Sequence, residues 1–165
     1  MRRTLLSVTT LVSICVAAPG YATPAAAQEP EVPEYDRATH GTRWLESDGG
    51  PTIKMLVEES NLGGGEVEIG EITFPVGSGA SGGEHMHGRV EIFYLLSGTF
   101  DHVVDGEAHR LTPGMIGIVR PGDNVIHRVI GDEPVRALVI WAPGGEIGRF
   151  DSGFRQRPVD GGPGR

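Results

Sequence analysis

Two histidines and a glutamate stand close together in the sequence with a spacing suited to metal binding. His85 and His87 are two residues apart, so in an extended strand both imidazoles point to one face and can converge on one ion. Glu91 follows in an otherwise apolar run, where a buried carboxylate is costly unless it is paired or bound to a metal. His127 lies in a later apolar run, and a β-barrel can bring it opposite the first pair. These four residues are the candidate metal ligands.

Three further polar residues are weaker candidates for catalysis. Glu84, beside His85, can serve as an acid or base or simply be a solvated loop residue. Arg89 has the same strand parity as Glu91 and can bind a substrate carboxylate or pair with that glutamate. His102 stands near an Asp-Gly hairpin turn, where it is either exposed or directed inward with its alternate neighbours in the strand.

Short apolar runs separated by turn sequences are typical of an all-β protein. The chain has 26 glycines spread between these runs, and no stretch shows sustained helical periodicity. The expected strands cover residues 52–58, 66–74, 89–96, 100–104, 107–111, 115–120, 125–130 and 135–141. This many short strands, joined by regular turns, indicates a barrel or a sandwich.

Two of these strands also predict which side chains are buried. In residues 66–74, Val67 and Ile69 alternate with polar residues and glycine, which predicts that these two side chains face the core. Residues 89–96 are apolar on both faces apart from Glu91, which predicts a strand buried on both sides. Something is therefore expected to cover the outer face of that strand.

The spacing around the candidate ligands resembles the first motif of the cupin superfamily. That motif is matched without gaps by Gly79, five residues, His85, one residue, His87, three residues, Glu91, six residues and Gly98. Taken singly, each histidine is more simply explained as a hydrogen-bonded core residue. The shared spacing favours the metal site.

A second motif of the same superfamily is present in weaker form around His127. Its proline, normally five residues before the histidine, is Pro121, six residues before it, and Asn124 stands where the motif has glycine. A one-residue insertion in the turn explains the shift. The resemblance spans about residues 66 to 150 and is strongest to the small, single-domain cupins grouped with quercetin dioxygenases.

This resemblance implies a single-domain jelly-roll barrel, also called a double-stranded β-helix, of the all-β class. It further implies one divalent metal held by His85, His87, His127 and Glu91, with two coordination positions open for a substrate, or for a substrate and dioxygen. Imidazole and carboxylate ligands suit Fe, Mn, Ni, Cu or Zn and do not choose among them. The family usually forms homodimers, which would cover the outer face of residues 89–96.

The N-terminus has the composition of a secretory signal. Residues 1–27 combine Arg2 and Arg3, an apolar stretch too short to span a bilayer, and a small-residue cleavage site. We therefore expect export to the periplasm or the extracellular space by the Sec route or, given the paired arginines, the twin-arginine route. The remainder is expected to divide into a flexible spacer at 28–40, the cupin domain at 41–150 and a disordered tail at 151–165.

Composition limits both the partners and the metal chemistry. Cys15, the only cysteine, lies inside the signal, so the mature chain can form neither a disulfide nor a thiolate metal site. Cleavage leaves 12 basic against 22 acidic residues, a net charge of −10. Such a chain is not expected to bind nucleic acid or, after signal cleavage, a membrane. The expected partners are a small-molecule substrate or ligand and a second copy of the chain.

Three functions fit these features. The first is a metal-dependent dioxygenase or related oxidoreductase acting on a small enolic, phenolic or carboxylate substrate. The second is a non-catalytic cupin that binds or senses a small molecule or the metal itself, which the lack of an obvious acid or base among the ligands also fits. The third is an isomerase or decarboxylase built on the same barrel.

Overall fold

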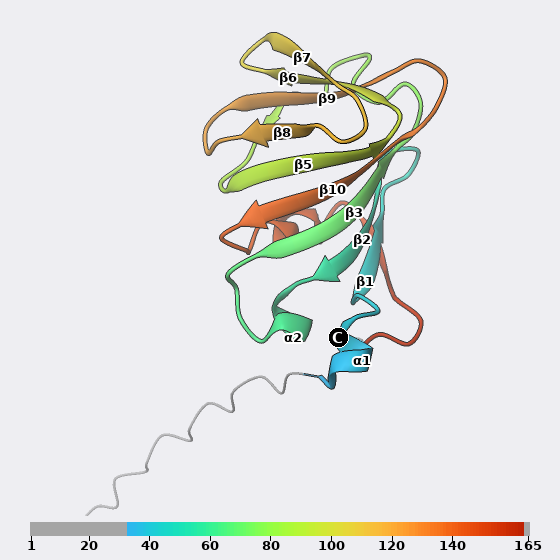
Figure 1. Ribbon diagram of the computed structural model, residues 1–165, viewed down its shortest axis with the longest axis vertical. Coiled ribbons are helices and arrows are strands. Elements are labelled where there is room, and N and C mark those ends of the chain that lie inside the picture. Colours follow the sequence, from blue (N-terminus) through green and yellow to red (C-terminus); the bar gives the residue numbers. More distant parts are fainter. Residues whose placement is uncertain (1–32, 164–165) are drawn as a thin grey trace, which may run out of the picture.

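The described part of the computed structural model, residues 33–163, folds into two antiparallel β-sheets. The larger sheet has seven strands in the order β11-β1-β2-β3-β10-β5-β8, and the smaller has four in the order β4-β9-β6-β7. Figure 1 shows the strands following one another along the long axis of the molecule, with two short helices at one end. This is a jelly-roll β-barrel, as the cupin-like motifs predict.

All eight expected strands are present, and their ends differ from expectation by at most two residues. They are β2 (Thr52–Val57), β3 (Glu68–Phe74), β5 (Val90–Ser97), β6 (Thr99–Val104), β7 (Glu107–Leu111), β8 (Ile116–Val119), β9 (Asn124–Ile130) and β10 (Val135–Ala142). The elements without an expected counterpart are all short: β1 (Arg43–Glu46), β4 (His85–Met86), β11 (Arg155–Pro158), α1 (Tyr35–Ala38), α2 (Glu59–Leu62) and the 3-10 helix η1 (Ile147–Phe150). Among residues 33–163, no helix has the length and apolar character needed to cross a membrane.

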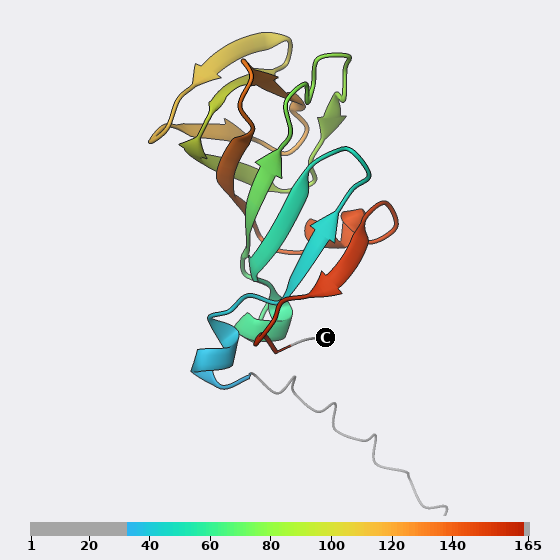
Figure 2. The same ribbon diagram turned by 90° about the vertical axis from the view of Figure 1, so that its right-hand side faces the viewer.

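The C-terminal segment is ordered further than the sequence predicts. Strand β11 pairs with β1, from Arg43 opposite Pro158 to Glu46 opposite Arg155. Figure 2 shows β11, in red, alongside β1, in cyan. The prediction that 151–165 is a disordered tail is therefore wrong for this strand, because cross-strand hydrogen bonds hold a sequence with almost no apolar residues.

The N-terminal boundary is also earlier than expected. Within the segment 28–40, predicted to be a flexible spacer, residues 35–38 form α1. The backbone N–H groups of Ala38 and Thr39 donate hydrogen bonds to the carbonyls of Glu34 and Tyr35 at 3.0 Å. The predicted signal peptide, residues 1–27, lies outside the described residues.

Strand β3 faces the core with the opposite side from the one its sequence predicts. Glu68 and Gly70 are buried, whereas Ile69 is half-buried on the other face. Gly70 faces inward because a Cβ there would lie 2.8 Å from Cγ2 of Ile53, so the missing side chain makes room for that residue. Glu68 faces inward because its Oε2 accepts hydrogen bonds of 2.9 Å from two backbone N–H groups at the start of η1. The alternation read from Val67 and Ile69 is therefore wrong by one residue.

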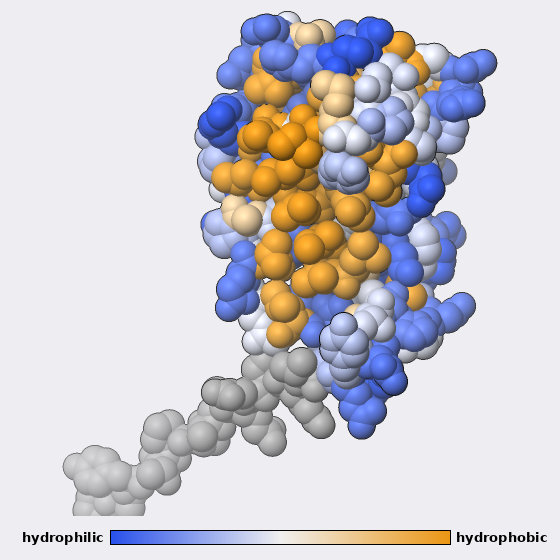
Figure 3. Space-filling view, in the orientation of Figure 1, coloured by the Kyte–Doolittle hydropathy of each residue, from blue (hydrophilic) through white to orange (hydrophobic). Residues whose placement is uncertain are grey.

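The core lies between the two sheets, and the outer face of the larger sheet is open. Phe93, Phe100 and Trp141 are among the largest fully buried side chains. On the opposite face of β5, Ile92 is half-buried and Tyr94 is 41% exposed. Figure 3 shows apolar residues gathered over the middle of this open face. In a single copy of the chain β5 is thus buried on one side, not on both as its sequence predicts.

Candidate metal centre

Elements from both sheets bring the four sequence-predicted ligands together. His85 begins β4, His87 follows that strand, and His127 lies on β9, all at the smaller sheet. Glu91 reaches them from β5 in the larger sheet. Because β4 pairs with β9, the centroid of the His85 ring lies 5.0 Å from that of His127. The ring of His87, two residues further along the chain, lies 4.8 Å from that of His85.

A glycine-rich loop holds His85 beside β9. The carbonyl of Ser78 accepts a hydrogen bond of 3.0 Å from the backbone N–H of Val129. The next residue, Gly79, has a φ of +72°, and a Cβ there would collide with the carbonyl of His127. Only glycine fits this approach, which explains why the cupin-like motif begins with it. At the end of the loop, Nδ1 of His85 donates to the carbonyl of Gly83 at 2.7 Å, leaving the Nε2 lone pair for the site.

Glu91 lies between the histidines. Its Oε2 is 3.2 Å from Nε2 of His87 and 3.5 Å from Nε2 of His127. Its Oε1 accepts a hydrogen bond of 2.9 Å from Nε1 of Trp141, the residue paired with Glu91 across β5 and β10. The donor atoms of His85, His87 and His127 in turn lie within 4.8 Å of one another. Imidazole nitrogens and a carboxylate oxygen therefore converge on one region of the barrel.

Two of these donor atoms are buried with no hydrogen-bond partner among the described residues: Nε2 of His87 and Oε2 of Glu91. Nδ1 of His127 is unpartnered as well, but the nitrogen of this ring that faces Glu91 is Nε2. Orphaned polar atoms are uncommon in folded proteins, because each has given up hydrogen bonds to water without replacement. A divalent transition metal binds such lone pairs, so the residues present fit a metal ion. All the candidate donors are nitrogen and oxygen atoms, and the chain's one cysteine, Cys15, lies outside the described residues.

Burial favours the neutral form of His87 and His127, which leaves them lone pairs for a metal. It lowers the pKa of His127 to about 3. Burial also lowers the pKa of His87, although the neighbouring Glu91 opposes that shift. Burial raises the pKa of Glu91 to about 7, because the hydrogen bond from Trp141 and the nearby histidines offset only part of the desolvation. A bound cation would restore the ionised carboxylate.

Acid is expected to destabilise the metal-free protein. Burial lowers the pKa of both His102 and His127 from 6.5 to about 3, so the unfolded chain takes up protons that the folded chain does not. This makes stability fall as the pH drops from 6.5 toward 3. Glu91 acts in the opposite sense, because its raised pKa makes stability fall as the pH rises from 4.5 to about 7, but it offsets only one histidine.

The melting temperature of chelator-treated protein, measured from about pH 7 down to about pH 4, checks this expectation. A net decline on acidification is expected. A melting temperature that stays flat or rises as the pH falls would contradict the burial of two neutral histidines.

Glu146 belongs to the site although no sequence pattern points to it. It lies just before η1, is 2% exposed, and its Oε1 is 3.1 Å from Nδ1 of His87. Because a carboxylate accepts, Nδ1 of His87 carries the proton and Nε2 presents its lone pair to the site. Arg149 forms an ion pair with the same carboxylate. In the sequence Glu146 is a single glutamate in a glycine-rich turn, and only the fold brings it to His87.

Replacing Glu146 with alanine is expected to weaken metal binding about 10- to 100-fold, because His87 would then be free to rotate and to change tautomer. Glu146→Gln should lose less, since the amide oxygen can still accept from Nδ1–H. Calorimetric titration with Zn²⁺ measures both effects. Equal affinities of the alanine variant and the wild type would show that Glu146 does not orient His87.

The structure separates the three weaker catalytic candidates. Glu84 and Arg89 are exposed and line neither of the cavities at the site. Arg89 precedes β5, so the parity it shares with Glu91 does not direct it inward. His102 is 1% exposed, pairs with His127 across β6 and β9, and its ring stacks on that of His127 at 5.5 Å. Of the three, His102 alone reaches the candidate ligands.

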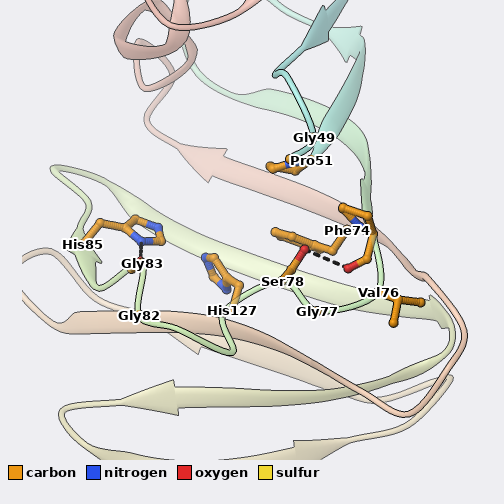
Figure 4. Close-up of a pocket in the computed structure, with 13 residues that line it drawn as sticks. Gly49, Pro51, Phe74, Val76, Gly77, Ser78, Gly82, Gly83, His85 and His127 are labelled. Carbon is orange, nitrogen blue, oxygen red and sulfur yellow. Dashed lines mark hydrogen bonds between the residues drawn. The ribbon is translucent and has the colours of Figure 1, made fainter.

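Two adjoining cavities lead to the site. The outer one, of about 400 Å³, is lined by the glycine-rich loop and by Pro51, Phe74, His85 and His127. Figure 4 shows the rings of His85 and His127 beside each other, with Pro51 and Phe74 on the other side of the pocket. The inner cavity, of about 100 Å³, shares these four residues and also contains His87, Glu91, Phe93 and Trp141 in its wall. This shape suits a small molecule with an apolar body.

Comparisons with known proteins agree with this fold. The family model of the cupin domain matches residues 70–141. No curated protein matched the sequence. A predicted oxalate decarboxylase from Thermotoga maritima is 18% identical with a TM-score of 0.52, over 62% of this chain and 92% of that one. The cupin domain of Cnp3 from Schizosaccharomyces pombe is 20% identical with a TM-score of 0.51, over 64% of this chain and 72% of that one. Ectoine synthase from P. lautus is 16% identical with a TM-score of 0.51, over 70% of this chain and 80% of that one.

At these identities the solved structures share the fold with this chain and carry no statement about its substrate. The matched segment, 70–141, contains all four candidate ligands and most of both sheets. The family match and the jelly-roll barrel agree, so residues 70–141 form a cupin domain.

Proposed function

We propose that this cupin binds one divalent transition metal through His85, His87, Glu91 and His127 and acts as a metal-dependent dioxygenase or related oxidoreductase. The proposed substrate is a small enolic, phenolic or carboxylate compound. The observation that best supports the metal site is the group of buried donor atoms that have no hydrogen-bond partner among the described residues. When bound, the ion would act as a Lewis acid toward a substrate oxygen and supply redox chemistry.

The cavity walls favour chemistry centred on the metal. Apart from the candidate ligands, the walls of the inner and outer cavities contain no titratable side chain in the part of the chain described. An isomerase needs an acid or base within hydrogen-bond reach of the proton it moves, and many decarboxylases share this need. A dioxygenase adds both atoms of O₂ to its substrate and consumes no separate reductant. In such an enzyme the side chains that line the cavity need only orient the substrate and exclude water. Apolar side chains can do both.

The dioxygenase proposal is tested by dioxygen uptake. Protein loaded with Fe, Ni, Mn or Cu is incubated with flavonols, catechols, diketones or oxalate, and oxygen is followed with an electrode. Uptake with at least one substrate class is expected, and Glu91→Ala should abolish it. Glu84→Ala, which changes an exposed carboxylate near the same loop, is the matched control. No uptake by fully loaded protein would count against the oxygenase.

A non-catalytic role in binding or sensing a small molecule, or the metal itself, is the second candidate. The same walls favour it, because apolar surfaces without an acid or base can hold a ligand without converting it. The third candidate is an isomerase or decarboxylase; a predicted oxalate decarboxylase from Thermotoga maritima shares the fold, which shows that the barrel can house such chemistry but not that this chain does. It lacks the acid–base side chain in the cavity walls that such chemistry commonly uses.

We also propose that two copies of the chain pair through the open face of the larger sheet. A cross-strand row of isoleucines crosses β8, β5, β10 and β3 on this face: Ile118, Ile92, Ile140 and Ile69. Exposed apolar patches of this kind are uncommon on monomers. Because each copy is acidic overall, this mainly apolar centre of the face is where two copies can approach with least repulsion. A two-fold interface would lay the patch against itself.

Changing Tyr94 and Ile116, neighbours on this face, to arginine is expected to convert the dimer to a monomer. Light scattering after size-exclusion chromatography measures the mass. Leu62→Arg, which changes an exposed apolar residue of α2 outside the patch, should leave the dimer intact. A monomeric wild type would refute the proposed pairing.

Export completes the proposed function. A protein that leaves the cytoplasm after cleavage near Ala27 would begin at or close to Gln28. N-terminal sequencing of protein recovered from the periplasm or the medium tests this. Recovery of intact chains from the cytoplasm alone would contradict it.

A further inference from the structure

His102 is a buried histidine that the proposed four-residue metal site does not use. It is 1% exposed, and its Nε2 has no hydrogen-bond partner among the described residues. A neutral imidazole left in this state forgoes a hydrogen bond that water would supply. The fold nevertheless makes a place for it, because a Cβ at Gly117 would lie 2.6 Å from Nδ1 of His102. A buried imidazole nitrogen without a hydrogen-bond partner is available to bind a ligand.

The donors around His102 form a second group that overlaps the first. The donor atoms of Glu91, His102 and His127 lie within 4.8 Å of one another, and all three residues are buried. In the smaller sheet His127 stands between His85 and His102, with ring centroids 5.0 Å and 5.5 Å away. His127 therefore belongs to both groups.

The two groups differ in their access to solvent. His85 is half-exposed and lines the outer cavity, so the group formed by His85, His87 and His127 lies at the mouth. His102 lines neither cavity, and its ring lies on the far side of His127 from His85. The group formed by Glu91, His102 and His127 consequently lies deeper in the barrel.

We propose that His102 is an additional metal ligand, which with Glu91 and His127 forms an inner binding position behind the one at the cavity mouth. Two imidazoles and a carboxylate are a donor set that divalent transition metals accept. The inner position would retain an ion when the half-exposed His85 does not contribute. This inference rests on the metal binding proposed above and extends it to a residue outside the family's motif.

Cobalt binding to variants of the full mature chain tests the inner position. Co²⁺ is titrated into the wild type, His85→Ala and the double variant His85→Ala/His102→Phe, and both the affinity and the visible absorption are recorded. His85→Ala is expected to keep one ion per chain, with altered absorption. Adding His102→Phe should lower the affinity of that variant at least tenfold. His85→Ala/His109→Gln is the matched control, because it removes an exposed histidine from the strand paired with β6.

The outcomes separate this inference from the proposed function. Equal Co²⁺ affinity and absorption in His85→Ala with and without His102→Phe would show that His102 is not a ligand, and so would complete loss of binding in His85→Ala alone. A wild type that binds no Co²⁺ would refute the metal site itself. Should phenylalanine prevent folding, His102→Gln, which keeps a polar side chain of similar reach, is expected to give the same loss of affinity.

Discussion

Replacing Glu91 with alanine is expected to lower the metal bound per chain at least tenfold. Glu91 supplies the carboxylate that approaches both His87 and His127, at 3.2 Å and 3.5 Å, and it belongs to both donor groups. Without it, the remaining donors are neutral imidazoles that leave the ion's charge uncompensated inside the barrel. Plasma mass spectrometry of dialysed protein measures the loss.

This substitution should spare the fold of the metal-free protein. Burial raises the pKa of Glu91 to about 7, so near neutral pH the carboxylate is itself costly to bury; its removal relieves that cost, which offsets the loss of the acceptor for Nε1 of Trp141. Glu84→Ala is the matched control and should bind as much metal as the wild type, because Glu84 is exposed. Unchanged metal content in Glu91→Ala would mean that the ion binds elsewhere.

Replacing Arg43 with methionine is expected to destabilise the protein by about 3–5 kcal/mol. Arg43 is 4% exposed, and its guanidinium contacts Glu58 at 2.8 and 3.2 Å, Asp151 at 2.8 Å and Gln156 at 2.7 Å. Methionine fills similar volume but leaves the carboxylate of Glu58, which is 7% exposed, without its cation. A buried charge that loses its partner accounts for most of the expected cost.

Urea denaturation of the two proteins measures this difference. Arg155→Met is the matched control, since Arg155 lies on β11, is 81% exposed and pairs with Glu46 at the surface. That change should cost less than about 1 kcal/mol. Equal stabilities of the Arg43 and Arg155 variants would show that the buried cluster does not hold β11 and the segment before it against β1.

The order of the C-terminal segment illustrates what sequence patterns miss. Residues 151–165 contain glycine, proline and charge, a composition that predicts disorder. Yet β11 is paired with β1 and tied down by Arg43 and Glu46, each of which contacts two or more partners from or near that strand. A polar strand that ion pairs hold at the edge of a sheet has no alternation of apolar residues, so its sequence does not reveal it as a strand.

The candidate metal centre could be predicted from the sequence where its geometry is local. The spacing of His85, His87 and Glu91 reflects one strand, one turn and the next strand, so a short motif records it. His127 required a match across the barrel, and the structure does bring it to the other three. Glu146 reaches His87 from a turn 59 residues away, and no local pattern encodes that contact.

Strand β3 shows how distant contacts can override a local pattern. The alternation of Val67 and Ile69 with polar residues is a good sign of a half-buried strand, but it gave the wrong face. The inward side is decided by Ile53, which needs the space at Gly70, and by the backbone of η1, which needs the carboxylate of Glu68. Both partners lie outside the strand.

Metal content is the most direct measure of the central claim, that Nε2 of His87 and Oε2 of Glu91, buried without a hydrogen-bond partner among the described residues, bind a metal ion together with His85 and His127. The protein is purified without chelator, equilibrated with each of Fe²⁺, Mn²⁺, Ni²⁺, Cu²⁺ and Zn²⁺, dialysed and analysed by plasma mass spectrometry. At least one metal should remain bound, and addition of that metal should raise the melting temperature. Protein that retains none of the five and melts at the same temperature with and without them would contradict the account.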